Sequence, residues 1–162
     1  MQTAAQTTPP KVVHTIPATI NLQEEVKNAH RQLRVAAYCR VSTKQEDQLN
    51  SYDVQRRAYT DKINGEPGWT MVGIYADKGI TGTSVKKRDD FNRLMRHCKQ
   101  GKVDMIITKS VARFARNTLD CLKHTRMLKE HNVDVYFEEQ GIHSIQPGAE
   151  FYITIYGSIA QS

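Results

Sequence analysis

The chain has 162 residues, of which 39% are hydrophobic and 25% charged, and its formal net charge is +6. This length suits one α/β domain with a sizeable core rather than two domains. No apolar run approaches the roughly 18 residues that would span a bilayer. The basic balance favours a polyanionic partner, either nucleic acid or an anionic membrane surface, although a basic protein without such a partner has the same composition.

The first residues, "MQTAAQTTPP", have neither a basic region nor an apolar region of the kind found in secretory signals. The chain has three cysteines, Cys39, Cys98 and Cys121. An odd, sparse set of cysteines without an export signal predicts reduced thiols and a cytoplasmic location.

Residues 1–30 are rich in Gln, Thr and Pro and are predicted to form a loosely ordered arm. Residues 31–162 are predicted to form one domain in which strand and helix patterns alternate. The expected strands, in chain order, are 33–41, 69–76, 103–108 and 133–140, and the expected helices are 48–64, 89–100, 118–131 and 149–162. This alternation predicts an α/β fold with a mostly parallel sheet of four or five strands flanked by helices.

The first expected strand, "LRVAAYCRV", is apolar on both faces, as in a buried parallel sheet, yet it contains an arginine. Side chains alternate along a strand, so Tyr38, Arg40 and Ser42 project from one face. Ligands of open α/β sheets bind in the crevice outside the carboxyl ends of the strands. We therefore expect Arg40 to line that crevice and to meet an anion, beside the Ser42 hydroxyl.

More polar residues follow the later strands at the same end of the sheet. Asp77 follows the second strand, and Arg88 ends the loop after it. Arg113 and Arg116 lie in a basic connector after the third strand, and their spacing places both on one side if that connector is helical. Several arginines around one serine suit a phosphodiester, because guanidinium groups bind phosphate oxygens in pairs and stay charged.

Each of these residues also has a purely structural interpretation. A serine at the end of a strand is usually structural, and Asp77 can belong to a turn. Arg113 and Arg116 can lie on a solvated helix face, with their stems covering the sheet. Their joint placement at one end of the sheet is what favours a functional site.

Three segments carry a family resemblance: "YCRVSTKQ", "IYADKGITGTSVKKRDDF" and "ITKSVARFARNT". They resemble the motifs of the serine site-specific recombinases, the resolvase/invertase family, and "SVARFARNT" is most similar to the large serine recombinases of conjugative transposons and phages. The resemblance covers residues 33–162. It implies a serine that attacks a DNA phosphodiester, giving a 5′-phosphoserine intermediate and strand exchange, with no metal or nucleotide cofactor.

The resemblance also implies roles for individual residues. Ser42 matches the nucleophile. Arg40, Arg113 and Arg116 match the phosphate-binding arginines, and Asp77 matches the active-site acid. The remaining matches support the site or contact DNA: Tyr38, Gln45, Arg88 and Lys109. The segment "GITGTSVKKR" is expected to be a mobile substrate loop, because it has two glycines and little apolar content.

One residue departs from the family pattern. Many small resolvases have Asp just before the first arginine of the "RxxR" pair, whereas this chain has Ala112. The proton acceptor for Ser42 is therefore open, with Asp77 or a phosphate oxygen as candidates, and His97 and His143 as more distant ones.

The resemblance implies double-stranded DNA as the partner, a homodimer that becomes a tetramer on synapsis, and work at the bacterial nucleoid. The last residues, "IYGSIAQS", are similar to the start of the family's long dimerisation helix. We expect that helix to continue in the complete protein, with further DNA-binding domains after it. The alternative function is a non-catalytic basic module that binds nucleic acid on the same scaffold.

Overall fold

The computed structural model describes residues 31–41, 45–78 and 88–160, and for residues 45–51 the description stops at the backbone. The chain divides into two units, Met1–Arg31 and Gln32–Ser162, and the account below concerns the second. The expected arm (1–30), Ser42 and most of the expected substrate loop (79–87) lie outside the described residues.

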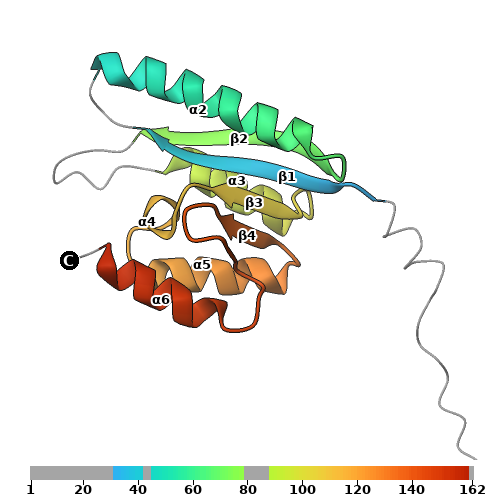
Figure 1. Cartoon of the computed structure of the whole chain (residues 1–162). Coiled ribbons are helices and arrows are strands. Elements are labelled where there is room, and N and C mark those ends of the chain that lie inside the picture. The colour runs from blue at the N-terminus through green and yellow to red at the C-terminus, as the bar shows by residue number, and fades with distance from the viewer. Residues whose placement is uncertain (1–30, 42–44, 79–87, 161–162) are drawn as a thin grey trace, which may run out of the picture. The chain divides into compact units, whose positions relative to one another are not determined.

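The second unit has a five-stranded sheet with helices on both faces (Figure 1). Its strands are β1 (Leu33–Val41), β2 (Trp69–Lys78), β3 (Met105–Thr108), β4 (Asp134–Phe137) and β5 (Ile142–His143). Its helices are α2 (Gln45–Gly65), α3 (Asp89–Lys99), α4 (Val111–Phe114), α5 (Thr118–Glu130) and α6 (Ala149–Ile159). The predicted α/β class with a mostly parallel sheet is confirmed.

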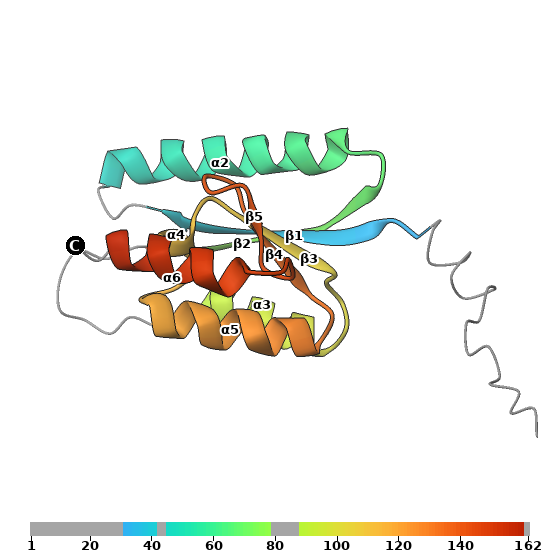
Figure 2. The ribbon, with the colours of Figure 1, turned by 60° about the horizontal axis from the view of Figure 1, so that its bottom comes forward.

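The strand order in the sheet is β2-β1-β3-β4-β5. The first four strands run parallel, so their carboxyl ends lie at one edge, and β5 pairs antiparallel with β4. Figure 2 shows α2 on one face of the sheet, with α3 and α5 on the other. A site at the carboxyl edge can therefore draw on the loops after all four parallel strands.

The β1 strand is buried on both faces, as its continuous apolar sequence predicts. Val35, Ala37 and Cys39 pack with Tyr59 and Ile63 of α2. Tyr38 belongs to the core on the opposite face. The predicted alternation of side chains is confirmed from Val35 to Cys39, and it directs Tyr38 towards the helices α3 to α6.

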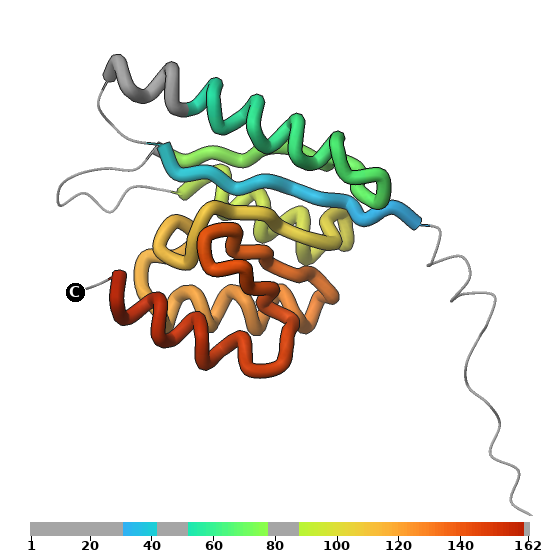
Figure 3. Tube along the Cα trace, in the orientation of Figure 1, coloured from blue at the N-terminus to red at the C-terminus, as the bar shows by residue number. Residues whose placement is uncertain are grey.

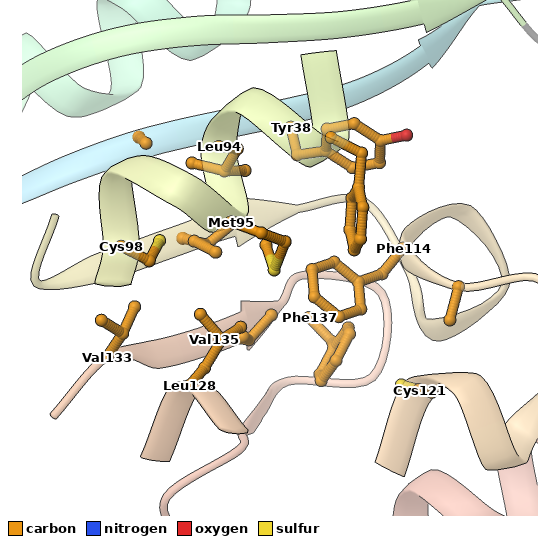
Figure 4. Packing of buried hydrophobic residues seen from close by; sticks show 14 of the residues in the cluster. Tyr38, Leu94, Met95, Cys98, Phe114, Cys121, Leu128, Val133, Val135 and Phe137 are labelled. Carbon is orange, nitrogen blue, oxygen red and sulfur yellow. The ribbon is translucent and has the colours of Figure 1, made fainter. Parts of the chain in front are cut away.

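The larger core lies on the face opposite α2. Figure 4 shows Tyr38 of β1 close to Phe114 of α4, with Phe137 of β4 on the other side of Phe114. The ring centroids of Phe114 and Phe137 are 5.7 Å apart, at an interplanar angle of 82°. Edge-to-face pairs of this kind stabilise a core beyond the area that they bury. The aromatic cluster thus holds α4 against the ends of β1 and β4.

Two short elements were not predicted from the sequence. The segment 109–117 contains α4, and the segment 141–148 contains β5. A four-residue helix and a two-residue strand are too short for their hydrophobic period to be detected. Contacts with neighbouring elements determine both of them, as in the pairing of β5 with β4. The β5 strand begins after Gly141, whose positive φ of 62° suits a tight reversal of the chain.

The three cysteines are free and buried. Burial raises the pKa of Cys39, Cys98 and Cys121 to about 12. Within the described residues, no helix is both long and apolar enough to cross a bilayer.

Candidate active site

The Tyr38 side chain connects two charged residues from different elements. Its hydroxyl donates to Asp77 Oδ2 at 3.0 Å and accepts from Arg88 Nη2 at 3.1 Å. The ring meets Phe91 edge-on, with centroids 5.2 Å apart. Burial raises the pKa of Tyr38, so this hydroxyl stays protonated and keeps donating to the carboxylate.

The Asp77 carboxylate also caps helix α3. It accepts from the backbone N–H of Asp90 at 3.0 Å and of Phe91 at 2.9 Å. In return, Asp90 Oδ2 accepts from the N–H of Ala76 at 3.0 Å. The cap residue of the helix, Arg88, makes no side-chain capping bond, so Asp77 supplies the cap from the neighbouring strand. Asp77 therefore ties the end of β2 to the start of α3.

The Arg88 guanidinium is held on several sides. It lies 3.6 Å above the ring centroid of Phe91, donates to the carbonyl oxygen of Phe114, and forms an ion pair with Asp120 at 3.7 Å. Its side chain is only 13% exposed. Arg88 is thus part of the packed structure and joins α3, α4 and α5 at this edge of the sheet.

Arg40 lies at the end of β1 and reaches towards α4. Its Nη1 donates to the carbonyl oxygen of Ala112 at 3.3 Å. Burial, followed by the neighbouring guanidiniums of Arg88, Arg113 and Arg116, lowers the pKa of Arg40, while Tyr38 opposes this change. Four guanidiniums near one another repel, and an anion between them would offset that repulsion.

Arg113 and Arg116 reach the site in different ways. Arg113 lies in α4 and is exposed, but Arg116 lies beyond the end of that helix. The two arginines do not share one helix, because Ala115 adopts an extended conformation and Asn117 already caps α5. The Arg116 N–H donates to Asp120 Oδ2 at 3.2 Å, which positions the residue between the two helices.

A groove of about 620 Å³ opens at the same edge, between α2 and the ends of β1, β3 and β4. Two ion pairs border it, between Lys62 and Glu138 and between Lys109 and Glu139. The groove is lined by Tyr38, Cys39, Arg40, Val54, Gln55, Ala58, Tyr59, Lys62, Lys109, Arg113, Glu138 and Glu139. Two of the clustered arginines therefore face a space that is open to a ligand.

A family model described as "Resolvase, N terminal domain" matches residues 35–162. The chain belongs to the resolvase family of serine recombinases.

A curated relative of this resolvase-family domain agrees with that assignment. The chain is 29% identical over 130 residues to the transposon Tn3 resolvase of Escherichia coli, a match that covers 80% of this chain and 63% of the relative. The chain thus spans less than two thirds of the length of this curated relative.

Solved structures support the same fold. A resolvase family site-specific recombinase from Streptococcus pneumoniae superposes with a TM-score of 0.59 at 30% identity, and the match covers 80% of this chain and 87% of that one. The N-terminal catalytic domain of TP901-1 integrase gives a TM-score of 0.52 at 21% identity, over 79% of this chain and 94% of that one, a likeness of fold.

The predicted site residues of this resolvase-family domain divide into three groups. The structure brings Tyr38, Arg40, Asp77, Arg88, Lys109, Arg113 and Arg116 to the carboxyl edge of the sheet. Gln45 begins α2, and its side chain is not described. Ser42 lies outside the described residues and directly follows Val41, the last residue of β1.

The two histidines considered as proton acceptors lie away from this edge. His97 Nδ1 and the Tyr75 hydroxyl form a hydrogen bond at 2.7 Å. His97 lies about 12 Å along α3 from Asp89, the first residue of that helix. His143 pairs with Asp134, the first residue of β4, at the opposite end of the sheet. Neither imidazole is positioned to take a proton at the end of β1.

The sequence interpretation missed Asp120 and Gln140. Asp120 binds the Arg116 backbone, pairs with Arg88 and contacts His124 Nε2 at 3.2 Å. Gln140 Oε1 accepts from the N–H of Val111, the first residue of α4, at 3.2 Å. Both residues look like ordinary surface polar residues in the sequence, and no local pattern marks their contacts.

Proposed function

We propose that this chain is the catalytic domain of a site-specific DNA recombinase in which Ser42 attacks a DNA phosphodiester. The observation that carries this proposal is the group of arginines around the end of β1. Arg40 lies two residues before Ser42 in the sequence, and Arg88, Arg113 and Arg116 lie near Arg40. Arg40 and Arg113 line an open groove, and Arg116 adds to the same positive field. Because Ser42 directly follows Val41 in the sequence, we propose that its hydroxyl attacks a scissile phosphate bound there.

The proposed step exchanges one phosphodiester for another. The Ser42 oxygen forms a bond to phosphorus, and the bond from phosphorus to the 3′-oxygen breaks. The protein is then joined through Ser42 to the 5′-phosphate of the DNA. The serine proton passes to an acceptor, and the 3′-oxygen takes up a proton as it leaves. Arg40, Arg113 and Arg116 stabilise the extra negative charge of the pentavalent transition state. Reversal of these steps on a new 3′-hydroxyl completes strand exchange.

The other residues support this step in our proposal. Asp77, Tyr38 and Arg88 hold the ends of β1, β2 and α3 in fixed positions. Lys109 forms an ion pair with Glu139 at 3.6 Å, and we assign it a contact with the DNA backbone. Gln45 is the first residue of α2, and we assign it a supporting or DNA-contacting role. Three donors already occupy the Asp77 carboxylate. A phosphate oxygen is therefore the better candidate for the proton acceptor.

We further propose that the complete protein belongs to the large serine recombinases, on the similarity of "SVARFARNT" to that group. Its partner would be double-stranded DNA, and its homodimer would form a tetramer on synapsis. The exposed apolar side chains of α6 suit such an assembly surface: Phe151, Tyr152, Ile155, Tyr156 and Ile159.

The proposal is tested by trapping the covalent intermediate. The complete protein is incubated with a pool of end-labelled duplexes of randomised sequence, and the reaction is quenched with detergent. Mass spectrometry then locates any nucleotide that remains on the protein. We expect DNA on Ser42, and we expect Ser42→Ala to abolish the adduct while DNA binding, measured by gel retardation, is retained.

Two results would contradict the proposal. An adduct that forms at a comparable rate in Ser42→Ala would move the nucleophile elsewhere. DNA binding by the wild type without any adduct, with duplexes that contain a nick to drive the reaction forward, would favour the non-catalytic binding module.

A further inference from the structure

The turn after β4 runs beside the segment that joins β3 to α4 (Figure 3). The N–H of Glu138 donates to the Thr108 carbonyl at 3.0 Å, and the N–H of Glu139 donates to the Lys109 carbonyl at 2.9 Å. These bonds continue the β3–β4 pairing beyond the strands. The turn is therefore fixed relative to the residues that lead into α4.

Gln140 is the next residue of this turn, and its side chain caps α4. Its Oε1 accepts from the N–H of Val111 at 3.2 Å, across 29 positions of the chain. The local cap residue, Ser110, makes no side-chain capping bond. An N-terminal N–H of a helix needs such an acceptor, and here it comes from a distant turn.

Helix α4 cannot fix its own position. It has four residues, and a single helical turn is unfavourable without outside contacts. Its carbonyls are held by Arg40 at Ala112 and by Arg88 at Phe114. Gln140 is the side chain that holds its first N–H, so it completes the set of contacts that determine the direction of α4.

We propose that Gln140 is a positioning residue for DNA cleavage, acting through Val111 on the placement of Arg113. This inference rests on the proposed function. Gln140 holds the first turn of α4, and that turn presents the Arg113 guanidinium to the groove beside Arg40. Loss of the cap would let α4 rotate or unwind and would move Arg113 away from the phosphate. Gln140 itself makes no contact with DNA in this proposal.

The test compares two variants of the residue. Gln140→Leu removes the acceptor at similar volume, whereas Gln140→Glu keeps an acceptor oxygen. Because misplacement of a catalytic group by about 1 Å can cost a factor of 10², we expect Gln140→Leu to slow adduct formation at saturating DNA by at least about tenfold. The apparent affinity for DNA should change by less than about threefold, since the charges are kept. Gln140→Glu should restore most of the rate.

A second measurement does not depend on activity. Hydrogen exchange of the α4 amides, Val111 to Phe114, should accelerate in Gln140→Leu and return towards the wild-type rate in Gln140→Glu. The β1 amides should keep their slow exchange, which shows that the variant is folded. A matched control is Gln146→Leu, because Gln146 Oε1 also accepts a backbone N–H, that of His143 at 3.3 Å, in a loop away from α4.

The outcomes separate this inference from the proposed function. Unchanged exchange in α4, or an unchanged rate of adduct formation in Gln140→Leu, would overturn the positioning role while leaving the function intact. If the wild type forms no Ser42 adduct, the proposed function fails, and the exchange data still decide whether Gln140 holds α4. An equal loss of rate in Gln146→Leu would also overturn the assignment, because the effect would then not be specific to α4.

Discussion

At the scale of single residues, the Tyr38 hydroxyl links the end of β1 to both Asp77 and Arg88. These two charged groups are partly buried, and each relies on that hydroxyl for one of its hydrogen bonds. Removal of one partner from a buried polar contact leaves the others without compensation. Loss of this hydroxyl should therefore destabilise the fold more than its small size suggests.

We predict that Tyr38→Phe lowers the free energy of unfolding by about 1–3 kcal/mol, because the ring still packs while the hydrogen bonds are lost. Urea denaturation followed by circular dichroism measures this change. The matched control is Tyr152→Phe on α6, whose side chain is half exposed and which should change stability by less than about 0.5 kcal/mol. Equal effects of the two variants would argue against the role given to the Tyr38 hydroxyl.

The three thiols yield a second prediction at this scale. Burial raises the pKa of each to about 12, so the thiolate is scarce at pH 8, and the sulfur atoms are also inaccessible. We expect the native chain to react slowly with a thiol-specific reagent, and all three cysteines to react at once in denaturant. Rapid labelling of one cysteine in the native protein, located by mass spectrometry, would contradict its burial.

At the scale of elements, helix α6 packs closely against the start of α5. A Cβ atom at Gly157 would overlap Thr118 Oγ1 and would lie 3.1 Å from Thr118 Cβ. The missing side chain thus permits the approach of the two helices. The rest of α6 exposes large apolar side chains, so its contact with the domain depends on few residues: Ala149, Ile153 and Gly157 are its buried ones.

We predict that Gly157→Ala destabilises the protein by about 1–3 kcal/mol, because the helices must separate to admit the methyl group. Alanine favours a helix over glycine by about 1 kcal/mol, so a loss would show that packing outweighs helix propensity. Thermal unfolding measures the change. Gly65→Ala is the control, because no heavy atom of the described residues lies within 4 Å of a Cβ atom built there. A loss of stability in Gly65→Ala without a loss in Gly157→Ala would contradict the argument.

At the scale of the whole molecule, the chain has a formal net charge of +6, and four of its arginines lie near one another at one edge of the sheet. Two of these, Arg40 and Arg113, line the groove. Basic residues that contact phosphates release counterions from DNA, and this makes binding depend on salt. The position of each arginine can therefore be tested by its effect on that dependence.

We predict that Arg40→Ala and Arg113→Ala each reduce the slope of log K against log salt by about 1, because each removes one phosphate contact. Fluorescence anisotropy with a labelled duplex over a series of salt concentrations measures the slope. Arg126→Ala is the control, since Arg126 is engaged by Glu150 at 2.7 Å between α5 and α6. An equal change in the control would mean that the binding surface is not the arginine cluster.

A further prediction concerns self-association. Phe151 is 65% exposed and Ile155 40% exposed on α6, and apolar groups of this kind mark contact surfaces. We expect weak, concentration-dependent association of the chain, and Phe151→Glu with Ile155→Glu should leave it monomeric in sedimentation equilibrium. Val54→Glu on α2, at a site that is 65% exposed, should not change it. Association that survives the α6 double variant would place the contact elsewhere.

Much of the fold follows from the sequence because local patterns decide it. The strand over Leu33–Val41 is apolar at nearly every position and has the bounds predicted for it. Asn117 caps α5 by accepting from the N–H of Asp120 at 2.8 Å, and asparagine is a residue type favoured at that position. Gly101, with a φ of 70°, follows the end of α3. These features depend on a few consecutive residues, so the sequence by itself determined them.

The candidate site was predictable only as a set of residue types. The sequence by itself indicated that Arg40 lies near the end of one parallel strand and that Arg113 and Arg116 follow another, and hence that they meet at one edge of the sheet. Only the tertiary structure decided that Asp77 caps α3, that Arg88 bonds to the Tyr38 hydroxyl, and that Gln140 caps α4. The physical reason is that these contacts join side chains to groups of other elements, 14 to 50 positions away in the chain, and the packing of those elements sets the geometry.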